Sequence, residues 1–193
     1  MSWPFLYFAG DRLSIAELCS ARLDGDLVEI GDAFMPTDAV ETRELRAASF
    51  RGSAAIGLAI TRESAAWVHG ALPQPPPRHS LQRRSGARGR PLVDLRVRYR
   101  DQPIASCDLL EISGVWVTTP ARTLADLVRA RYEGEDVAAA VDALLAWRPA
   151  LAAEARDILS ARSGLHFKRP AMRDLRRLIA PDPSEGAQEE VTR

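Results

Sequence analysis

The chain has 193 residues, of which 46% are apolar and 27% charged, and its 26 basic and 26 acidic residues balance to a net charge of zero. A chain of this length buries enough surface to fold without a disulfide or a structural metal, and its apolar runs fall short of the ~18 residues that a membrane span requires. Cys19 and Cys107 lie far apart without metal-type partners, so we expect reduced, partly buried thiols in a cytoplasmic protein.

The basic residues are concentrated in one short stretch. Residues 78–100 hold eight arginines and one aspartate, a net charge of +7, whereas residues 1–77 carry −4 and residues 101–193 carry −3. This stretch, which we call the arginine block, is the one strong electrostatic anomaly of the sequence.

The N-terminal residues predict a small helix–hairpin unit. Ser14 is a suitable N-cap for a helix that ends near Arg22. Residues 27–30 alternate as a strand does, Gly31-Asp32 predicts a turn, and residues 33–35 predict the returning strand. A helix, a turn and a hairpin form the back half of a winged helix, so we predict a truncated winged-helix-like unit over residues 1–40.

The middle of the chain favours strands. A helix over 42–49 and a weak apolar stretch at 56–60 precede Thr61, which we expect to cap a helix that stops at Gly70. A proline-rich linker then leads to two alternating strands, 79–84 and 92–100, which are joined by a flexible loop. The second strand has an arginine-rich face, predicted to point outward, opposite an apolar face formed by Val93, Leu95, Val97 and Tyr99.

Helices dominate the last third. After a strand pair at 109–112 and 115–117, the periodicity predicts helices over 120–132, 135–147, 150–161 and 171–179. The polar tail over 181–193 favours disorder. The fold class is therefore α+β, with one α+β domain over residues 41–180 following the N-terminal unit.

The sequence contains no catalytic motif that we recognise. It lacks a glycine-rich phosphate loop, a Gly-x-Ser-x-Gly elbow, Cys-x-x-Cys and His-x-x-x-His. His79 and His166 are isolated in sequence, and His69 is expected to meet the last carbonyls of its own helix. A nuclease would need spaced acids followed by a lysine, but Lys168 is the single lysine, and Asp157 precedes it on a predicted helix. We predict no enzymatic activity, no cofactor and no metal.

The arginine block has two interpretations. Its arginines could contact the phosphates of double-stranded DNA, or they could pair with the acidic ends of the same chain. The candidate contact residues are Arg78, Arg83, Arg84, Arg88, Arg90, Arg96, Arg98 and Arg100. A second, smaller basic face at Arg169, Arg173, Arg176 and Arg177 is more typical of a solvated helix.

The string GVWVTTPARTLADL, residues 114–127, predicts a sharp strand-to-helix junction. Thr119 is a suitable N-cap, and Pro120 then occupies the first helical position, where its missing N–H costs nothing. Leu124 and Leu127 belong to the predicted buried stripe. Arg122 and Asp126 lie four residues apart on the side expected to be exposed, where they can pair weakly.

Three pieces of the sequence resemble the actinobacterial AbiEi-type antitoxin family of type IV toxin–antitoxin systems. They are LVEIGDAF at 27–34, ESAAWVHG at 63–70 and, most specifically, TTPARTLADL at 118–127 with Thr119, Pro120, Arg122, Leu124, Asp126 and Leu127. The same module precedes very-short-patch-repair-like endonuclease domains in other proteins. The resemblance implies a regulator that binds its promoter through an N-terminal winged helix, and a C-terminal part that helps neutralise a nucleotidyltransferase-type toxin.

The leading hypothesis is therefore a cytoplasmic, non-enzymatic, DNA-binding transcriptional regulator, with a toxin as a possible protein partner. The arginine block would supply most phosphate contacts, since Arg12 and Arg22 are the basic residues of the short, acid-rich helix–hairpin unit. The alternative is a protein-binding module that has lost DNA binding. An endonuclease is a third and weaker reading, because we expect no endonuclease-like extension after Ile179.

Overall fold

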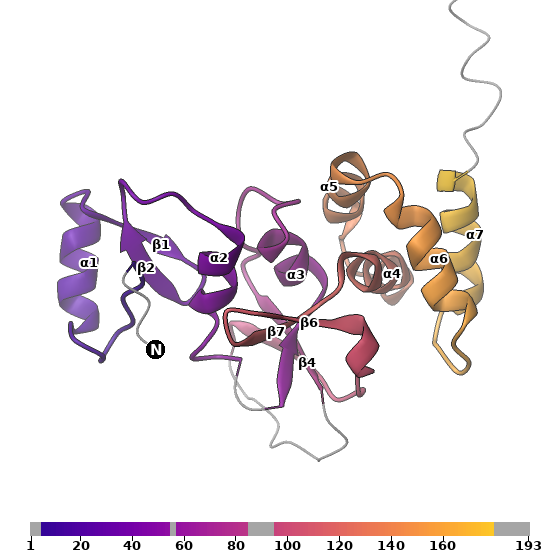
Figure 1. The fold of residues 1–193 in the computed structure, drawn as a ribbon, viewed down its shortest axis with the longest axis horizontal. Coiled ribbons are helices and arrows are strands. Elements are labelled where there is room, and N and C mark those ends of the chain that lie inside the picture. Colours follow the sequence, from indigo (N-terminus) through magenta and orange to yellow (C-terminus); the bar gives the residue numbers. More distant parts are fainter. Residues whose placement is uncertain (1–4, 55–56, 85–94, 180–193) are drawn as a thin grey trace, which may run out of the picture. The chain divides into compact units, whose positions relative to one another are not determined.

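The computed structural model describes residues 5–54, 57–84 and 95–179 (Figure 1). The chain divides into two compact units, Met1–Thr123 and Leu124–Arg193. The division falls within one helix, α4 (Pro120–Ala130). The fold is α+β, as the sequence predicts. The predicted boundary after residue 40 stays a prediction, and the predicted tail over 181–193 lies outside the described residues.

The first unit contains three helices and seven strands among its described residues, besides the first turn of α4 and a short 3-10 helix, Ser106–Asp108. In chain order they are α1 (Ile15–Leu23), β1 (Leu27–Ile30), β2 (Ala33–Pro36), α2 (Arg43–Ser49), β3 (Leu58–Ile60), α3 (Arg62–Val68), β4 (His79–Arg83), β5 (Val97–Arg100), β6 (Leu109–Ile112) and β7 (Val115–Thr118). Each of the strands predicted from alternation is present, with ends shifted by a few residues at most where the chain is described.

Five of these strands form one mixed sheet in the order β5-β4-β3-β7-β6. Strand β3 is parallel to β7, and β4 is parallel to β5, while the β3–β4 and β6–β7 pairs are antiparallel. One face of the sheet carries Ile60, Leu81 and Val117. These residues belong to the same buried cluster as Phe50, which directly follows α2, and Trp67, which lies in α3. Helices α2 and α3 therefore cover that face.

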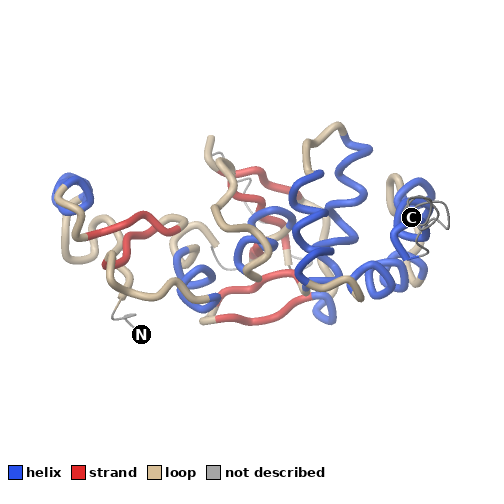
Figure 2. Tube along the Cα trace, turned by 90° about the horizontal axis from the view of Figure 1, so that it is seen from above, coloured by secondary structure: helices blue, strands red, loops and turns tan. Residues whose placement is uncertain are grey.

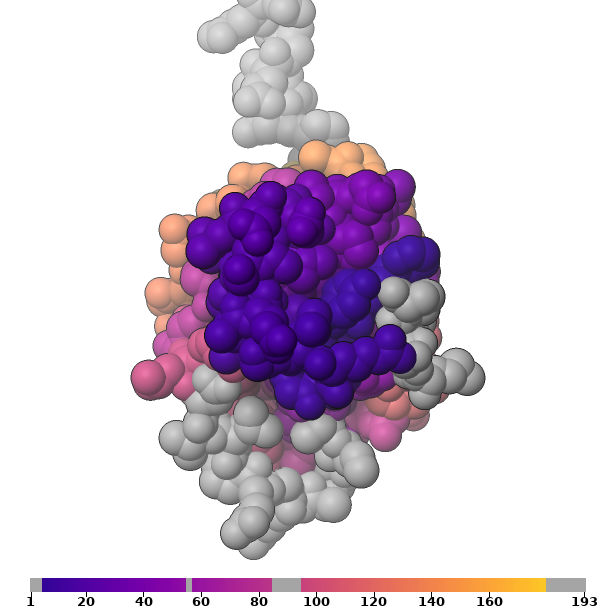
Figure 3. Space-filling model, turned by 90° about the vertical axis from the view of Figure 1, so that its left-hand side faces the viewer, coloured from indigo at the N-terminus to yellow at the C-terminus, as the bar shows by residue number. Residues whose placement is uncertain are grey.

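The helix–hairpin unit precedes the sheet, and its two-stranded ribbon is separate from the five-stranded sheet (Figure 2). Helix α1 begins with a capping box, in which the Ser14 hydroxyl accepts from the Glu17 N–H and the Glu17 carboxylate accepts from the Ser14 N–H. Leu18 packs with Phe34 of β2 in a small core of its own. Figure 3 shows, in indigo, the surface that these N-terminal residues present.

A buried contact between Asp32 and His79 connects the ribbon to the sheet. The Asp32 carboxylate, in the β1–β2 turn, lies 3.5 Å from the His79 Nε2 at the start of β4, and both side chains are largely buried. The Ser53 hydroxyl donates to the other Asp32 oxygen. Burial alone would raise the pKa of the Asp32 carboxyl, but the hydrogen bonds from His79 and Ser53 outweigh it and hold that pKa below the ordinary aspartate value. His79 is thus isolated in sequence but paired in space.

Replacing Asp32 with asparagine should make the stability less dependent on pH. Because the folded-state pKa lies below the unfolded-state value of about 3.9, the stabilisation is complete above that value and is lost as the pH falls through the folded-state pKa. We expect D32N to lower the free energy of unfolding by about 1.5–3 kcal/mol at neutral pH and by far less in acid. Urea unfolding across this pH range measures the difference, with the exposed Asp38→Asn as control. An equal loss at every pH would contradict the assignment.

The second unit is helical among its described residues. After α4 come a 3-10 turn, Arg131–Glu133, and the helices α5 (Ala138–Trp147), α6 (Leu151–Ser160) and α7 (Lys168–Ile179). Helix α5 begins three residues later than predicted, because the chain turns at Gly134 with a φ of 82°. Helix α7 begins three residues earlier than predicted, because Pro170 is tolerated in the first helical turn.

Candidate nucleic-acid interface

The parallel pairing of β4 with β5 brings two arginine-bearing segments side by side. The His79 N–H donates to the Arg96 carbonyl at 2.7 Å, and Gln82 lies opposite Arg100. Arg78 and Arg96, which precede the two strands, are both exposed and lie at the same end of the pair. The structure therefore assembles part of the arginine block from segments about 18 residues apart. Arg88 and Arg90 lie outside the described residues.

Arg83 lies on the face of the sheet that carries Leu81, opposite to the face that carries Arg98 and Arg100. Its guanidinium lies 2.8 Å from the Asp101 carboxylate, with only 13% of its side chain exposed. The Tyr99 hydroxyl donates to the same carboxylate at 2.9 Å. Because Asp101 already neutralises Arg83, this arginine follows the second interpretation of the block, pairing within the chain.

Arg98 and Arg100 are half-buried rather than on an open outer face. They are registered with Ser80 and Gln82, whose side chains are buried, and partners in register share a face of the sheet. The predicted open exposure of these arginines is therefore wrong. Of the residues predicted to face inward, Val97 is buried and Tyr99 is half-buried. Leu95, predicted to face inward, is 91% exposed because it precedes the strand.

Arg84, which follows β4, lies against an aromatic ring. Its guanidinium carbon is 4.2 Å from the centroid of the Trp116 ring in β7. The Arg84 N–H donates to the Gly57 carbonyl at 2.7 Å, so the backbone here continues the β3–β4 ladder. This places Arg84 on the same face of the sheet as Trp116.

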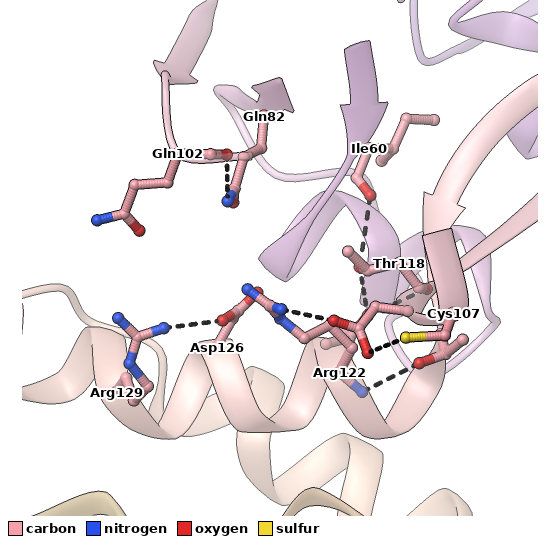
Figure 4. A network of polar contacts seen from close by, with 11 residues as sticks. Ile60, Gln82, Gln102, Cys107, Thr118, Arg122, Asp126 and Arg129 are labelled. Atoms are coloured by element: carbon pink, nitrogen blue, oxygen red, sulfur yellow. Dashed lines mark hydrogen bonds and ion pairs between the residues drawn. The ribbon is translucent and has the colours of Figure 1, made fainter. Parts of the chain in front are cut away.

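The junction between β7 and α4 is a network of satisfied polar groups (Figure 4). The Thr119 hydroxyl accepts from the Arg122 N–H at 3.2 Å, as expected of an N-cap, and Pro120 opens the helix. The Thr118 hydroxyl contacts the Ile60 carbonyl and the Thr123 hydroxyl. His69 Nε2 lies 2.7 Å from the Thr118 carbonyl, so the ring contacts β7. These contacts make the junction part of the scaffold.

Arg122 and Asp126 lie on a buried side of α4 and not on the exposed side predicted from the sequence. All residues from 121 to 130 are buried. Arg122 lies 2.7 Å from the Asp108 carboxylate, whereas Asp126 lies 3.0 Å from Arg129. A buried charge must be compensated at short range, which explains why the partners are chosen by packing. Leu124 and Leu127 are fully buried, as predicted.

The second unit carries a mixed aromatic and basic surface. The rings of Tyr132 and Phe167 stack with centroids 6.2 Å apart, and both side chains are exposed. The Tyr132 hydroxyl donates to Asp174 at 2.7 Å. Leu178 and Ile179 at the end of α7 are also exposed. So are the four arginines of the second basic face predicted from the sequence, Arg169, Arg173, Arg176 and Arg177. The predicted solvated helix face is confirmed for these arginines.

The described residues hold no group of histidine, cysteine or acidic side chains arranged to bind a metal ion. Within the same ranges, no helix combines the length and the apolar content needed to cross a membrane. Cys19 is half-buried as expected, but Cys107 is exposed.

Comparison with known proteins gives one family match. A family model described as the AbiEi antitoxin C-terminal domain matches residues 54–163, which is more than half of the chain. The matched range runs from the residues that precede β3 to the residues after α6, and it includes the arginine block and the β7–α4 junction. No curated protein matches the chain.

Proposed function

Because this chain belongs to the AbiEi antitoxin family, we propose that it is a non-enzymatic, DNA-binding transcriptional regulator that also neutralises a nucleotidyltransferase-type toxin. Its role as the antitoxin of a toxin–antitoxin system, with a toxin as partner, follows from the family. DNA binding, the type of toxin and the absence of enzymatic activity are parts of the proposal.

The exposed arginines at the amino ends of β4 and β5 carry the DNA-binding proposal. Arg78 and Arg96 are exposed and adjacent in space, and the net charge of the block is +7. Arginines of this kind bind phosphates through charge-assisted hydrogen bonds without reading sequence. The proposal includes Arg88 and Arg90, on the sequence argument alone, and assigns Arg83 a structural role with Asp101.

The helix–hairpin unit contributes only an accessory contact in this proposal. Its exposed charged side chains comprise two arginines, Arg12 and Arg22, and a larger set of acids, Asp11, Glu17, Asp24, Asp26, Glu29 and Asp38. Arg22 lies 3.4 Å from Glu29. An acidic surface repels the phosphate backbone, so insertion of α1 into a groove would be opposed electrostatically.

Replacing Arg78 and Arg96 together with alanine should weaken DNA binding in a salt-dependent way. Loss of two phosphate contacts is expected to make the negative slope of log affinity against log salt concentration shallower by about 2. The affinity itself should fall on the order of tenfold. Fluorescence anisotropy measures both, with a labelled duplex from the region upstream of the chain's own gene. The double replacement of Arg43 and Arg176, which are exposed arginines elsewhere, should change little.

Salt-independent affinity of the wild-type protein, or equal losses in the test and control variants, would overturn the DNA-binding proposal. The alternative is a module that binds a protein and no DNA. The aromatic and basic surface around Tyr132 and Phe167 favours this alternative, because tyrosine and arginine are enriched where interfaces gain most of their binding energy. Purification from the native host with a stoichiometric protein partner and no nucleic acid would support it.

A further inference from the structure

We propose that a cavity in the first unit binds a nucleoside phosphate. The cavity lies on the sheet where β3 and β7 begin and β4 ends, away from the exposed Arg78 and Arg96. It has a volume of about 600 Å³ and is lined by Arg51, Ala54, Gly57, Leu58, Arg84, Gly114, Val115 and Trp116. This volume is in the range of small-molecule sites and is far larger than a single phosphate ion requires.

Arg84 is the principal anion-binding group of the cavity. Its guanidinium stacks on the Trp116 ring at 4.2 Å, which uses the face of the guanidinium and leaves its N–H edge for a ligand. No carboxylate of the described residues forms a salt bridge with Arg84. A guanidinium that is oriented by stacking and not neutralised by a carboxylate is well suited to hold a phosphate by two parallel hydrogen bonds.

Arg51 supplies a second positive charge at the same cavity. Its side chain is 44% exposed, and it lies 3.6 Å from the exposed Asp11 carboxylate. An ion pair as exposed and as long as this one is weak. Its guanidinium also lies 5.0 Å from the centroid of the Phe8 ring, which orients it. A phosphate in the cavity would compete with Asp11 and with the other contacts of Arg51, and two arginines would then share the anion.

The rest of the lining fits the base and sugar of a nucleotide. Ala54 is apolar and Trp116 adds an aromatic edge, whereas the side chains of Leu58 and Val115 are almost fully buried in the core beneath the cavity. Gly57 and Gly114 have φ values of 94° and 78°, and a Cβ added at Gly114 would meet no atom within 4 Å. The rim of the cavity is thus open at Gly114. A glycine is favoured at this position by the left-handed backbone conformation and not by close packing. An aromatic ring, a small apolar residue and two guanidiniums together match a nucleoside phosphate better than a bare anion.

Isothermal titration calorimetry with the four ribonucleoside monophosphates tests the proposal. We expect saturable binding of at least one nucleotide, weakened about tenfold or more by Arg84→Ala or by Arg51→Ala. Arg148→Ala is the matched control, because Arg148 also lies over a tryptophan, Trp147, but does not line this cavity. Arg84→Lys keeps the charge without the planar fork and should bind with intermediate affinity.

Two sources of the ligand, a free nucleotide and the end of a nucleic-acid strand, share this chemistry. A 5′-phosphorylated oligonucleotide that competes with the mononucleotide, while an unphosphorylated one does not, would assign the strand end. Absence of nucleotide binding, binding unchanged in folded Arg84→Ala, or inorganic phosphate bound as tightly as the nucleotide would each overturn the proposal. The Arg78/Arg96 variant should bind nucleotide normally, so this test is independent of the DNA-binding proposal.

Discussion

Replacing Arg122 with alanine is expected to lower the free energy of unfolding by about 3–5 kcal/mol, a large part of the total for a domain of this size. The Arg122 guanidinium lies 2.7 Å from the Asp108 carboxylate, and 5% of each side chain is exposed. Truncation removes the opposite charge and leaves the Asp108 carboxylate buried without it. The cost of that uncompensated charge, rather than the strength of the ion pair, dominates the effect.

Chemical denaturation at neutral pH measures this loss. The matched control is Arg148→Ala, because Arg148 and Glu154 form an ion pair of nearly the same length, 2.8 Å, with nearly half of each side chain exposed. This exposed pair should contribute less than about 1 kcal/mol. Replacing both members of the buried pair, as in R122M with D108L, should recover most of the stability. A loss in R122A no greater than that in R148A would contradict the role assigned to the buried pair.

Replacing Arg129 with alanine should destabilise the second unit by a similar amount. Arg129 lies 3.0 Å from the Asp126 carboxylate, and its Nε donates to the His166 carbonyl at 2.9 Å. The side chain therefore compensates a buried acid and also attaches the segment before α7 to α4. We expect a loss of about 3–5 kcal/mol, with faster amide hydrogen exchange in α7.

Arg131→Ala is the control for this variant, because Arg131 is about half exposed and lies 4.0 Å from Asp174. It should leave hydrogen exchange in α7 nearly unchanged. If Arg129→Ala lowered stability but protected α7 as well as the wild type does, the contact with His166 would not be what anchors that helix.

Many of the elements could be predicted because their signals are local. Ser14 and Glu17 lie three residues apart and cap each other, and Thr119 caps the helix that Pro120 opens. These interactions need only the residues on either side, so sequence spacing is sufficient to find them. The helix starts predicted least well are those of α5 and α7. Gly134, in a left-handed conformation, delays the start of α5, whereas Pro170 is accommodated in the first turn of α7.

The candidate site could be predicted in composition but not in geometry. The arginine block is evident from counting charges, and the parity of β5 is correct for Val97. Sequence could not distinguish Arg83, which pairs with Asp101, from Arg84, which stacks on Trp116 and lines a cavity. Neighbours in a strand point to opposite faces, but what covers each face depends on segments that are remote in sequence.

The sequence by itself determined the secondary structure, the strand-to-helix junction and the family, because each depends on contiguous residues. Only the tertiary structure decided which charges are paired. Arg122 pairs with Asp108, which lies 14 positions earlier in the sequence, and the Asp32 carboxylate contacts His79 across 47 positions. Burial is the physical reason, since an enclosed charge is tolerated only beside the partner that packing brings within hydrogen-bonding distance.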